Sequence, residues 1–225
     1  MGLTIVGLPL GNIKDISLRA IETLDKATVV ICEDTRVFGK LWAKLMQMEL
    51  LNHKFEGKLE VVNDFNEGDK AKTMAQKIVD YGEEVLLVSD AGMPVFSDPG
   101  YKLVKELREL NQEVKVIPGP TAASTALVMS GLPSDRVLFL GFLPKKQIKR
   151  TEIWAGIKKL GFGVTLAIYE APGRTDETIA ELRCEFEGAE IVVTREISKE
   201  YEEVIENPEA EREYRGEVVI LVRVA

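Results

Sequence analysis

Histidine is almost absent from this chain, which has one in 225 residues. That residue, His53, lies in the polar segment 52–58, and no G-x-S-x-G motif occurs anywhere. A hydrolase of the Ser-His-Asp or Cys-His type needs a histidine beside its nucleophile. The sequence therefore disfavours that class, and we expect His53 to be a solvent-exposed surface side chain.

Cysteine is also rare, and the two residues, Cys32 and Cys184, are far apart in the sequence. Their spacing gives neither a disulfide framework nor a zinc motif. Both lie in or beside apolar runs. We expect two buried free thiols in a reducing compartment, and no metal site.

Long hydrophobic runs are missing as well. No stretch approaches the roughly 18 consecutive apolar residues that a membrane-spanning helix needs. The N-terminus lacks a basic segment followed by a long apolar stretch and a small-residue cleavage site. We expect a cytoplasmic protein that makes no contact with a membrane.

Positive charge is in deficit, because 29 Lys and Arg stand against 37 Asp and Glu, for a formal net charge of −8. Such a chain must hold any polyanion with a local patch. One dense basic run exists, made of Lys145, Lys146, Lys149 and Arg150. From the residues alone, this run is either a solvated loop that leads into a helix or a contact for a phosphate backbone.

The sequence does contain a regular alternation of apolar strands and amphipathic helices. With 45% hydrophobic and 29% charged residues, it has the composition of a globular protein. Alternation of this kind predicts a parallel sheet covered on both faces. The chain reads as two α/β domains, 1–118 and 119–225. We expect strands near 3–6, 28–32, 58–63, 85–88, 114–117, 137–142, 165–169, 190–194 and 218–224, and helices after Ser17 and Pro99 and near 68–81, 121–129 and 175–184.

The longest loop motif, LVSDAGMPVFSDPG at 87–100, follows one of these strands. Parallel sheets bind ligands at such strand-to-helix turns. Asp98 with Pro99 is a good helix start, and Gly92 permits backbone shapes that a Cβ would block. Taken alone, the loop is either a rigid connection or the wall of a ligand site, and Asp90 is either a loop staple or an active-site charge.

Seven motifs in succession resemble those of the small-subunit ribosomal RNA 2′-O-ribose cytidine methyltransferase family, a branch of the tetrapyrrole methylase superfamily. They run from residue 6 to about residue 203. In order they are VGLPLGNIKDISLRAIETL, ICEDTR, LVSDAGMPVFSDPGY, PGPTAA, SGLPSDRVLFLGFLPKK, IYEAPGR and TREISKEYEE. The classical dinucleotide fingerprint G-x-G-x-x-G is absent, so the resemblance does not rest on an ordinary Rossmann motif.

The resemblance implies a tetrapyrrole methylase-like α/β fold with a mainly parallel N-terminal sheet and a mixed C-terminal sheet. It also implies a homodimer, S-adenosylmethionine bound in a cleft between the domains, and no metal. The substrate would be ribosomal RNA or the small ribosomal subunit. The positions that match the cofactor-binding motifs are Pro9, Asp90, Gly92, Met93, Phe96, Thr121, Ala122, Tyr169 and Pro172.

A ribose hydroxyl is a poor nucleophile, so methyl transfer to it needs positioning and a base that accepts its proton. On this resemblance Asn12, Asp34, Arg36 and Lys199 organise the substrate hydroxyl and phosphate. The base is left open between Glu33, Asp34 and Glu170. Each of these charges is alternatively a helix cap, a loop staple or a surface group. Asp98 is expected chiefly to cap its helix.

The motifs depart from the family pattern at two places. Val37 and Phe38 stand where the family pattern EDTRHT has His and Thr, and Gly173 stands where YESPHR has His. Two other functions stay open: a methyltransferase for a tetrapyrrole or another small molecule, and a non-catalytic S-adenosylmethionine-binding protein. The loop sequences Gly92-Met93-Pro94 and Leu10-Gly11-Asn12, in place of G-D-P and P-G-D, favour RNA.

Overall fold

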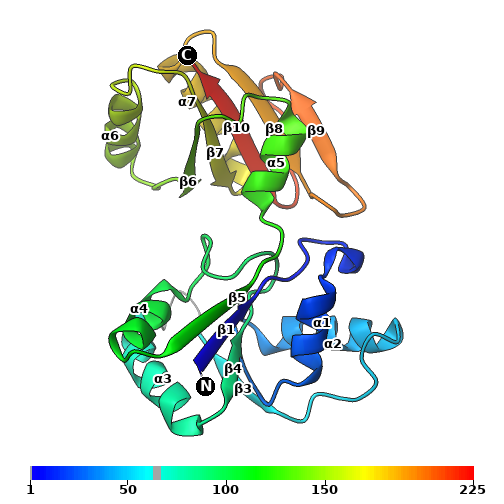
Figure 1. Cartoon of the computed structure of the whole chain (residues 1–225). Coiled ribbons are helices and arrows are strands. Elements are labelled where there is room, and N and C mark those ends of the chain that lie inside the picture. Colours follow the sequence, from blue (N-terminus) through cyan, green and yellow to red (C-terminus); the bar gives the residue numbers. More distant parts are fainter. Residues whose placement is uncertain (1, 63–66) are drawn as a thin grey trace. The chain divides into compact units, whose positions relative to one another are not determined.

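The computed structural model describes residues 2–62 and 67–225 and divides into two compact units, Met1–Thr121 and Ala122–Ala225 (Figure 1). Each unit contains one five-stranded sheet with its own hydrophobic core. The predicted pair of α/β domains is confirmed. The sequence placed the end of the first domain at Pro118, whereas the compact unit runs on to Thr121.

The first unit is built on a sheet whose strands run in the order β3-β2-β4-β1-β5, with every neighbouring pair parallel. The predicted parallel sheet is therefore confirmed. The end of the strand expected over 58–63, at Asn63, lies outside the described residues. The strands are β1 (Gly2–Val6), β2 (Val29–Cys32), β3 (Lys58–Val61), β4 (Glu84–Leu87) and β5 (Glu113–Ile117).

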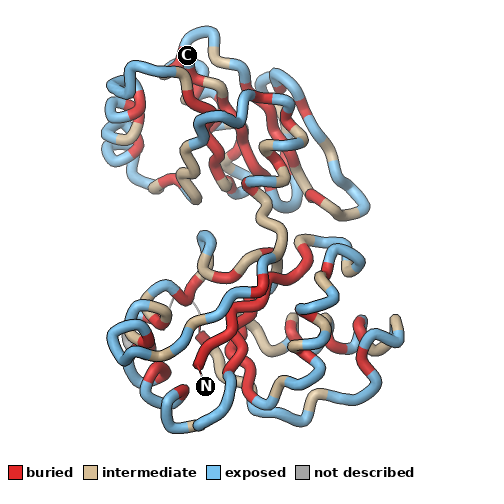
Figure 2. Tube along the Cα trace, viewed as in Figure 1, coloured by how far each residue is buried: buried red, intermediate tan, exposed pale blue. Residues whose placement is uncertain are grey.

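Helices cover both faces of this sheet. On one face, α1 (Leu18–Asp25) and α2 (Thr35–Gln47) close a core that includes Trp42 and Leu45. On the other, α3 (Glu67–Tyr81) and α4 (Tyr101–Glu109) close a second core. Figure 2 shows buried strands between helices whose outer faces are exposed. A short 3-10 turn, η1 (Ile13–Asp15), precedes α1.

The helix starts are correctly predicted at α1 but not at α4. Ser17 caps α1, because its Oγ accepts a hydrogen bond from the Ala20 N–H at 3.1 Å. The N-cap of α4 is Gly100 instead of Asp98, and this residue makes no side-chain capping hydrogen bond. Glu67 supplies the acceptor, with Oε1 at 2.8 Å from the Gly100 nitrogen and 2.9 Å from the Lys102 nitrogen. A carboxylate distant in the sequence has taken the capping role.

The second unit contains a mixed sheet with strand order β6-β7-β10-β8-β9. Only β6 and β7 are parallel, and the other neighbours are antiparallel, which confirms the expected mixed sheet. The edge strand β9 was not predicted, because it has only four residues and two of them are glutamate. The strands are β6 (Val137–Phe142), β7 (Val164–Glu170), β8 (Glu190–Arg195), β9 (Glu203–Glu206) and β10 (Val218–Val224).

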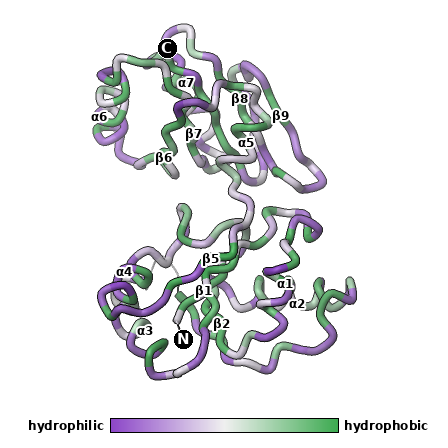
Figure 3. The backbone as a smooth tube through the Cα atoms, in the orientation of Figure 1, coloured by the Kyte–Doolittle hydropathy of each residue, from purple (hydrophilic) through white to green (hydrophobic). Residues whose placement is uncertain are grey.

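Trp154 is at the centre of the second unit's main core and is fully buried. Its indole Nε1 donates a hydrogen bond to Glu181 Oε1 at 2.7 Å. The middle of β7, at 166–168, and most of β10, at 218–222, are hydrophobic (Figure 3), as expected of strands buried on both faces. The helical elements are α5 (Ala122–Ser130), α6 (Gln147–Ile157), η2 (Pro172–Arg174) and α7 (Thr175–Glu185).

The two thiols differ in their surroundings. Cys32 is buried, as predicted, but Cys184 is exposed, so the prediction for Cys184 is wrong. The core-facing side of α7 is formed by Thr175, Thr178, Ile179 and Leu182, and Cys184 lies off that side. His53 keeps 47% of its side chain exposed, as expected. Across the described residues, no helix is both long and apolar enough to cross a membrane.

Candidate functional site

Three loops of the first unit are joined where the parallel strands end. The Gly7 N–H donates to the Ile117 carbonyl at 2.9 Å, which ties the loop after β1 to the end of β5. The Leu8 N–H donates to the Gly92 carbonyl at 2.8 Å, and the Gly92 N–H donates to the Pro9 carbonyl at 3.3 Å. The candidate cofactor residues Pro9 and Gly92 are thus direct neighbours at the ligand-binding edge of the sheet.

Glycines allow these loops to pack backbone against backbone. A Cβ on Gly7 would lie 2.5 Å from both Cα and N of Gly119, closer than any real contact. Gly92 has φ +73°, and a Cβ there would lie 3.0 Å from Leu10 Cδ2 and 3.4 Å from the Pro120 carbonyl oxygen. The loops after β1, β4 and β5 therefore form one rigid assembly that extends to Thr121, the last residue of this unit.

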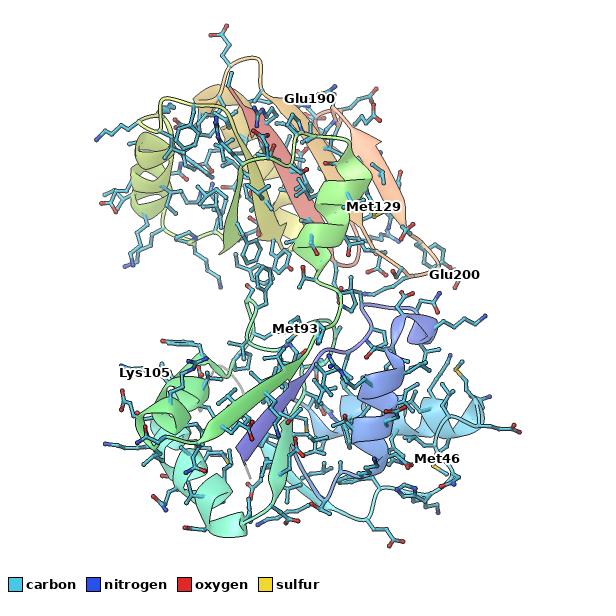
Figure 4. The ribbon with its side chains drawn as sticks, viewed as in Figure 1. Met46, Met93, Lys105, Met129, Glu190 and Glu200 are labelled. Carbon is cyan, nitrogen blue, oxygen red and sulfur yellow. The ribbon has the colours of Figure 1, made fainter. Side chains whose placement is uncertain are left out.

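The loop between β4 and α4 is held in a strained form. Val95 and Ser97 have φ values of 72° and 69°, a region that a β-branched valine rarely adopts. Ser89 Oγ donates to the Ala91 carbonyl at 3.0 Å and fixes the start of the loop. Met93, labelled in Figure 4, packs against the core beneath it, whereas Phe96 is 39% exposed. Strain of this kind concentrates at functional sites.

Three carboxylates, Glu33, Asp34 and Asp90, surround the end of β2. Burial, followed by the charges of Asp90, Asp34 and Glu33, raises the pKa of the Cys32 thiol to about 11. Burial first, and then the Asp34 carboxylate, raises the pKa of Asp90, although a hydrogen bond from the Asp34 backbone opposes the shift. Three of the candidate site charges are therefore close together at the end of β2.

Asp34 already has a partner within its own motif. Its Oδ1 caps α2 by accepting the Arg36 N–H at 2.8 Å, and its Oδ2 lies 2.5 Å from Arg36 Nη2. Hydrogen bonds from the Arg36 side chain, and then from its backbone, lower the pKa of Asp34 to about 2. An ionised carboxylate of such low basicity is better suited to positioning than to proton abstraction.

In an Arg36→Ala variant we expect the pKa of Asp34 to rise from about 2 toward its ordinary value of 3.8. The backbone bond remains, so the rise should be incomplete. Since folding lowers this pKa, the stability that the pair contributes is present above pH 3.8 and is lost as the pH falls toward 2. Carboxyl-carbon NMR titration measures the shift, with Arg19→Ala as the control. An unchanged Asp34 pKa would contradict the assigned pairing.

Asn12 also makes a local contact. Its Oδ1 accepts the Lys14 N–H at 3.1 Å and caps the 3-10 turn η1. Asn12 therefore has a structural contact in the loop after β1, on the same edge of the sheet as Asp34 and Arg36. Its assignment to substrate binding stays a prediction.

In the second unit, Tyr169 lies beside the start of α5. Its hydroxyl accepts a hydrogen bond from the Ala123 N–H at 3.1 Å, which brings Tyr169 close to Ala122. Its ring packs edge-on against Phe139 at 5.0 Å and Phe142 at 5.6 Å between centroids. Pro172 begins η2, directly after β7.

Glu170, one of the three candidate bases, is buried instead of facing a substrate. Its side chain is fully buried, and its oxygens accept from Ala171 N at 2.8 Å, Arg174 Nε at 2.9 Å and Thr178 Oγ1 at 2.8 Å. These bonds fasten the end of β7 to η2 and α7. A carboxylate enclosed in this way cannot reach a substrate hydroxyl, so we correct its assignment as a candidate base to a structural role.

Lys199 belongs to the second unit and is paired there. Its Nζ lies 3.2 Å from Glu196 Oε1 and 3.1 Å from Glu217 Oε2. Burial acts to lower the pKa of Lys199, but Glu217 and then Glu196 outweigh it, so the pKa is raised. The amine stays charged at neutral pH and can hold a phosphate, whereas it cannot serve as a base.

The basic run at the start of α6 is smaller than predicted. Lys145, Lys146 and Lys149 are exposed, together with Ile148 between them. Arg150 is only 3% exposed and forms an ion pair with Glu181 of α7. Arg150 therefore does not fit the interpretation of this run as a phosphate contact, because its guanidinium is buried and paired within the second unit.

A second set of basic side chains was missed. Arg36, Lys40 and Lys44 follow one another at intervals of four along α2, and all three are exposed. That interval places them along one side of a helix, so the signal was available in the sequence. Mostly apolar residues separate them, so the row does not form a dense basic run in the sequence. In the described part of the chain, no group of three potential metal ligands exists.

Comparison with known proteins gives consistent matches. A family model described as Tetrapyrrole (Corrin/Porphyrin) Methylases matches residues 2–212. The chain is 42% identical over 202 residues to a Rickettsia prowazekii protein named ribosomal RNA small subunit methyltransferase I, covering 90% of this chain and 68% of that protein. A Mycoplasmopsis pulmonis protein of the same name is 40% identical, covering 88% of this chain and 84% of that protein.

Solved structures share the fold at low identity. Diphthine synthase superposes with a TM-score of 0.68 at 14% identity, covering 98% of this chain and 89% of the other. Uroporphyrin-III C-methyltransferase from Thermus thermophilus, complexed with S-adenosyl homocysteine, gives 0.65 at 18% identity, covering 99% and 97%.

Proposed function

The chain belongs to the tetrapyrrole methylase family, and on that basis we propose that it transfers a methyl group from S-adenosylmethionine to small-subunit ribosomal RNA, at the 2′-oxygen of a cytidine. The observation that carries the choice of substrate is the 42% identity, over 90% of the chain, to a ribosomal RNA small subunit methyltransferase I. The tetrapyrrole-modifying neighbour resembles the chain at only 18% identity.

The joined loops of the first unit form a surface that suits the cofactor. Gly92 lets the loops after β1, β4 and β5 pack closely, because a Cβ there would crowd Leu10 and Pro120. In our proposal the joined loops around Pro9, Gly92 and Thr121 hold the polar parts of S-adenosylmethionine through main-chain groups. Met93 and Phe96 supply apolar surface. We assign Ala122, Tyr169 and Pro172 to the cofactor from their motifs.

The bound cofactor supplies a methyl group on a positively charged sulfur. In the transfer, the 2′-oxygen forms a bond to the methyl carbon while the carbon–sulfur bond breaks, and the electron pair remains on a neutral thioether. The hydroxyl proton must pass to a base. The chain's main contribution is to align the oxygen behind the methyl carbon.

The catalytic roles divide according to the contacts of each carboxylate. Asp34 is paired with Arg36 and has a low pKa, and Glu170 is enclosed within the second unit. Glu33 keeps its assignment as a candidate base from the ICEDTR motif. Asp34 positions Arg36, which has 85% of its side chain exposed, for a substrate phosphate. Asn12 and Lys199 complete the proposed contacts.

The test is incubation of the purified chain with labelled S-adenosylmethionine and small ribosomal subunits, with calorimetry of cofactor binding alongside. We expect cofactor binding and incorporation of label into the RNA. Binding without transfer to subunits or total RNA would favour a non-catalytic cofactor-binding protein. Transfer only to tetrapyrroles or other small molecules would favour the metabolite methyltransferase.

Further parts of the proposal concern partners. We infer that Lys145, Lys146 and Lys149 contact the RNA backbone from the second unit, and that a homodimer extends the basic surface. The acidic net charge of −8 makes such local patches necessary. A cytoplasmic location follows from the proposed ribosomal substrate.

A further inference from the structure

A hollow of about 270 Å³ lies beside the proposed cofactor loops of the first unit. Its walls come from the loop after β1, from α2 and from the first residues of the loop after β4. The floor is largely apolar, with Leu10, Ile13, Val37 and Leu41 among its residues. The hollow therefore opens at the edge of the sheet where parallel-strand proteins bind ligands.

Charges of both signs stand around this apolar floor. Lys40 and Lys44, both exposed, line the hollow from successive turns of α2, and Arg36 lies one turn earlier on the same side of the helix. Asp90 lines it from the loop after β4, next to the candidate cofactor residue Gly92. An apolar surface flanked by two ammonium groups suits a flat, anionic ligand.

We propose that this hollow receives the target nucleotide of the RNA, with its base against the apolar floor and its phosphates on Lys40 and Lys44. The inference rests on the proposed function and adds the place where the substrate is held. It gives the acidic first unit a polyanion contact of its own, separate from the lysines at the start of α6.

The size of the hollow supports a single nucleotide. Pockets for small ligands enclose roughly 300–1,000 Å³, and this one lies just below that range. Enzymes that do chemistry on a base take that base out of its stack into a pocket where apolar side chains face it, and the apolar floor of this hollow offers a comparable surface. Pro9 and Asp90, which both line the hollow, would bring the ribose next to the cofactor loops.

The experiment compares Lys40→Glu/Lys44→Glu with a matched control, Lys70→Glu/Lys72→Glu. The control makes the same change in net charge at exposed lysines of α3, on the opposite face of the sheet. The measurements are binding of small-subunit RNA at several salt concentrations, and calorimetry of S-adenosylmethionine binding. A third variant, Val37→Phe, narrows the hollow without altering charge, and its melting temperature monitors folding.

For Lys40→Glu/Lys44→Glu we expect RNA affinity to fall about tenfold or more, and the slope of log affinity against log salt to become shallower by about 2. Cofactor affinity should stay unchanged, and the control should behave as wild type. Val37→Phe should lose methyl transfer to RNA while it retains cofactor binding.

Three results would count against the account. Wild-type RNA affinity and salt slope in Lys40→Glu/Lys44→Glu would overturn the inference while leaving the proposed function intact. Loss of cofactor binding in the same folded variant would assign the hollow to the cofactor, and would also overturn it. Failure of the wild-type chain to methylate RNA would instead overturn the proposed function, and the inference with it.

Discussion

Glu170→Ala is expected to lower the free energy of unfolding by about 3 kcal/mol, near the lower end of the range for breaking a buried ion pair. The side chain of Glu170 is 0% exposed, whereas its partner Arg174 keeps 27% of its side chain exposed and can recover some hydration. The hydroxyl of Thr178, in a fully buried residue, loses its acceptor as well. Chemical denaturation followed by circular dichroism measures the change.

Two further variants, Glu187→Ala and Glu170→Gln, serve as controls for Glu170→Ala. Glu187→Ala removes an exposed carboxylate shortly after α7 and should change the free energy of unfolding by no more than about 0.5 kcal/mol. Glu170→Gln keeps an acceptor for Thr178 and should recover part of the stability. If Glu170→Ala unfolded like the wild type but lost methyl transfer, the structural assignment would be wrong, and Glu170 would return as a candidate base.

Gly7→Ala is expected to abolish cofactor binding, or to weaken it more than tenfold, and to destabilise the first unit by about 1–3 kcal/mol. The added Cβ would lie 2.5 Å from the Gly119 backbone, and no side-chain rotation relieves a contact between main chains. The loop after β1 must then move away from the end of β5, which separates Pro9 from its bonded partner Gly92. Calorimetry with S-adenosylmethionine and thermal melting measure the two effects.

Gly39→Ala is the matched control for Gly7→Ala. Gly39 lies within α2 of the same unit, and a Cβ there meets no atom within 4 Å. Alanine is the better helix former, so we expect the variant to be more stable by about 0.5–1 kcal/mol, with unchanged cofactor affinity. Tight cofactor binding by a folded Gly7→Ala variant would contradict the joined loops as the cofactor seat.

The alternation of strands and helices was predictable because hydrophobic period is a local property of the sequence. Ser17 at the start of α1 is such a case, since the cap and the helix are adjacent. The start of α4 was not predictable, because Glu67, far away in the chain, accepts the N–H groups of Gly100 and Lys102. The strained φ values of Val95 and Ser97 likewise depend on tertiary packing.

The sequence predicted which loops form the candidate site better than it predicted the contacts of their side chains. Two pairs of motif residues are neighbours within their own units, Pro9 with Gly92 and Ala122 with Tyr169, and their assignment to the cofactor stays a prediction. The roles of charged residues depended on partners that the sequence does not reveal. Arg150 lies four residues before the buried Trp154, on the same side of α6. A buried guanidinium also needs an anionic partner, which Glu181 of α7 provides.

The chemical position of the added methyl group tests the central claim most directly. After reaction with labelled S-adenosylmethionine, RNA from small ribosomal subunits is hydrolysed in alkali, which cleaves each phosphodiester through its neighbouring 2′-hydroxyl. A 2′-O-methyl group blocks that cleavage, so we expect the label in an alkali-resistant dinucleotide that begins with cytidine. Label on a base, recovered in ordinary mononucleotides, would contradict the account. So would RNA without label, if the protein is shown to bind both the subunits and the cofactor.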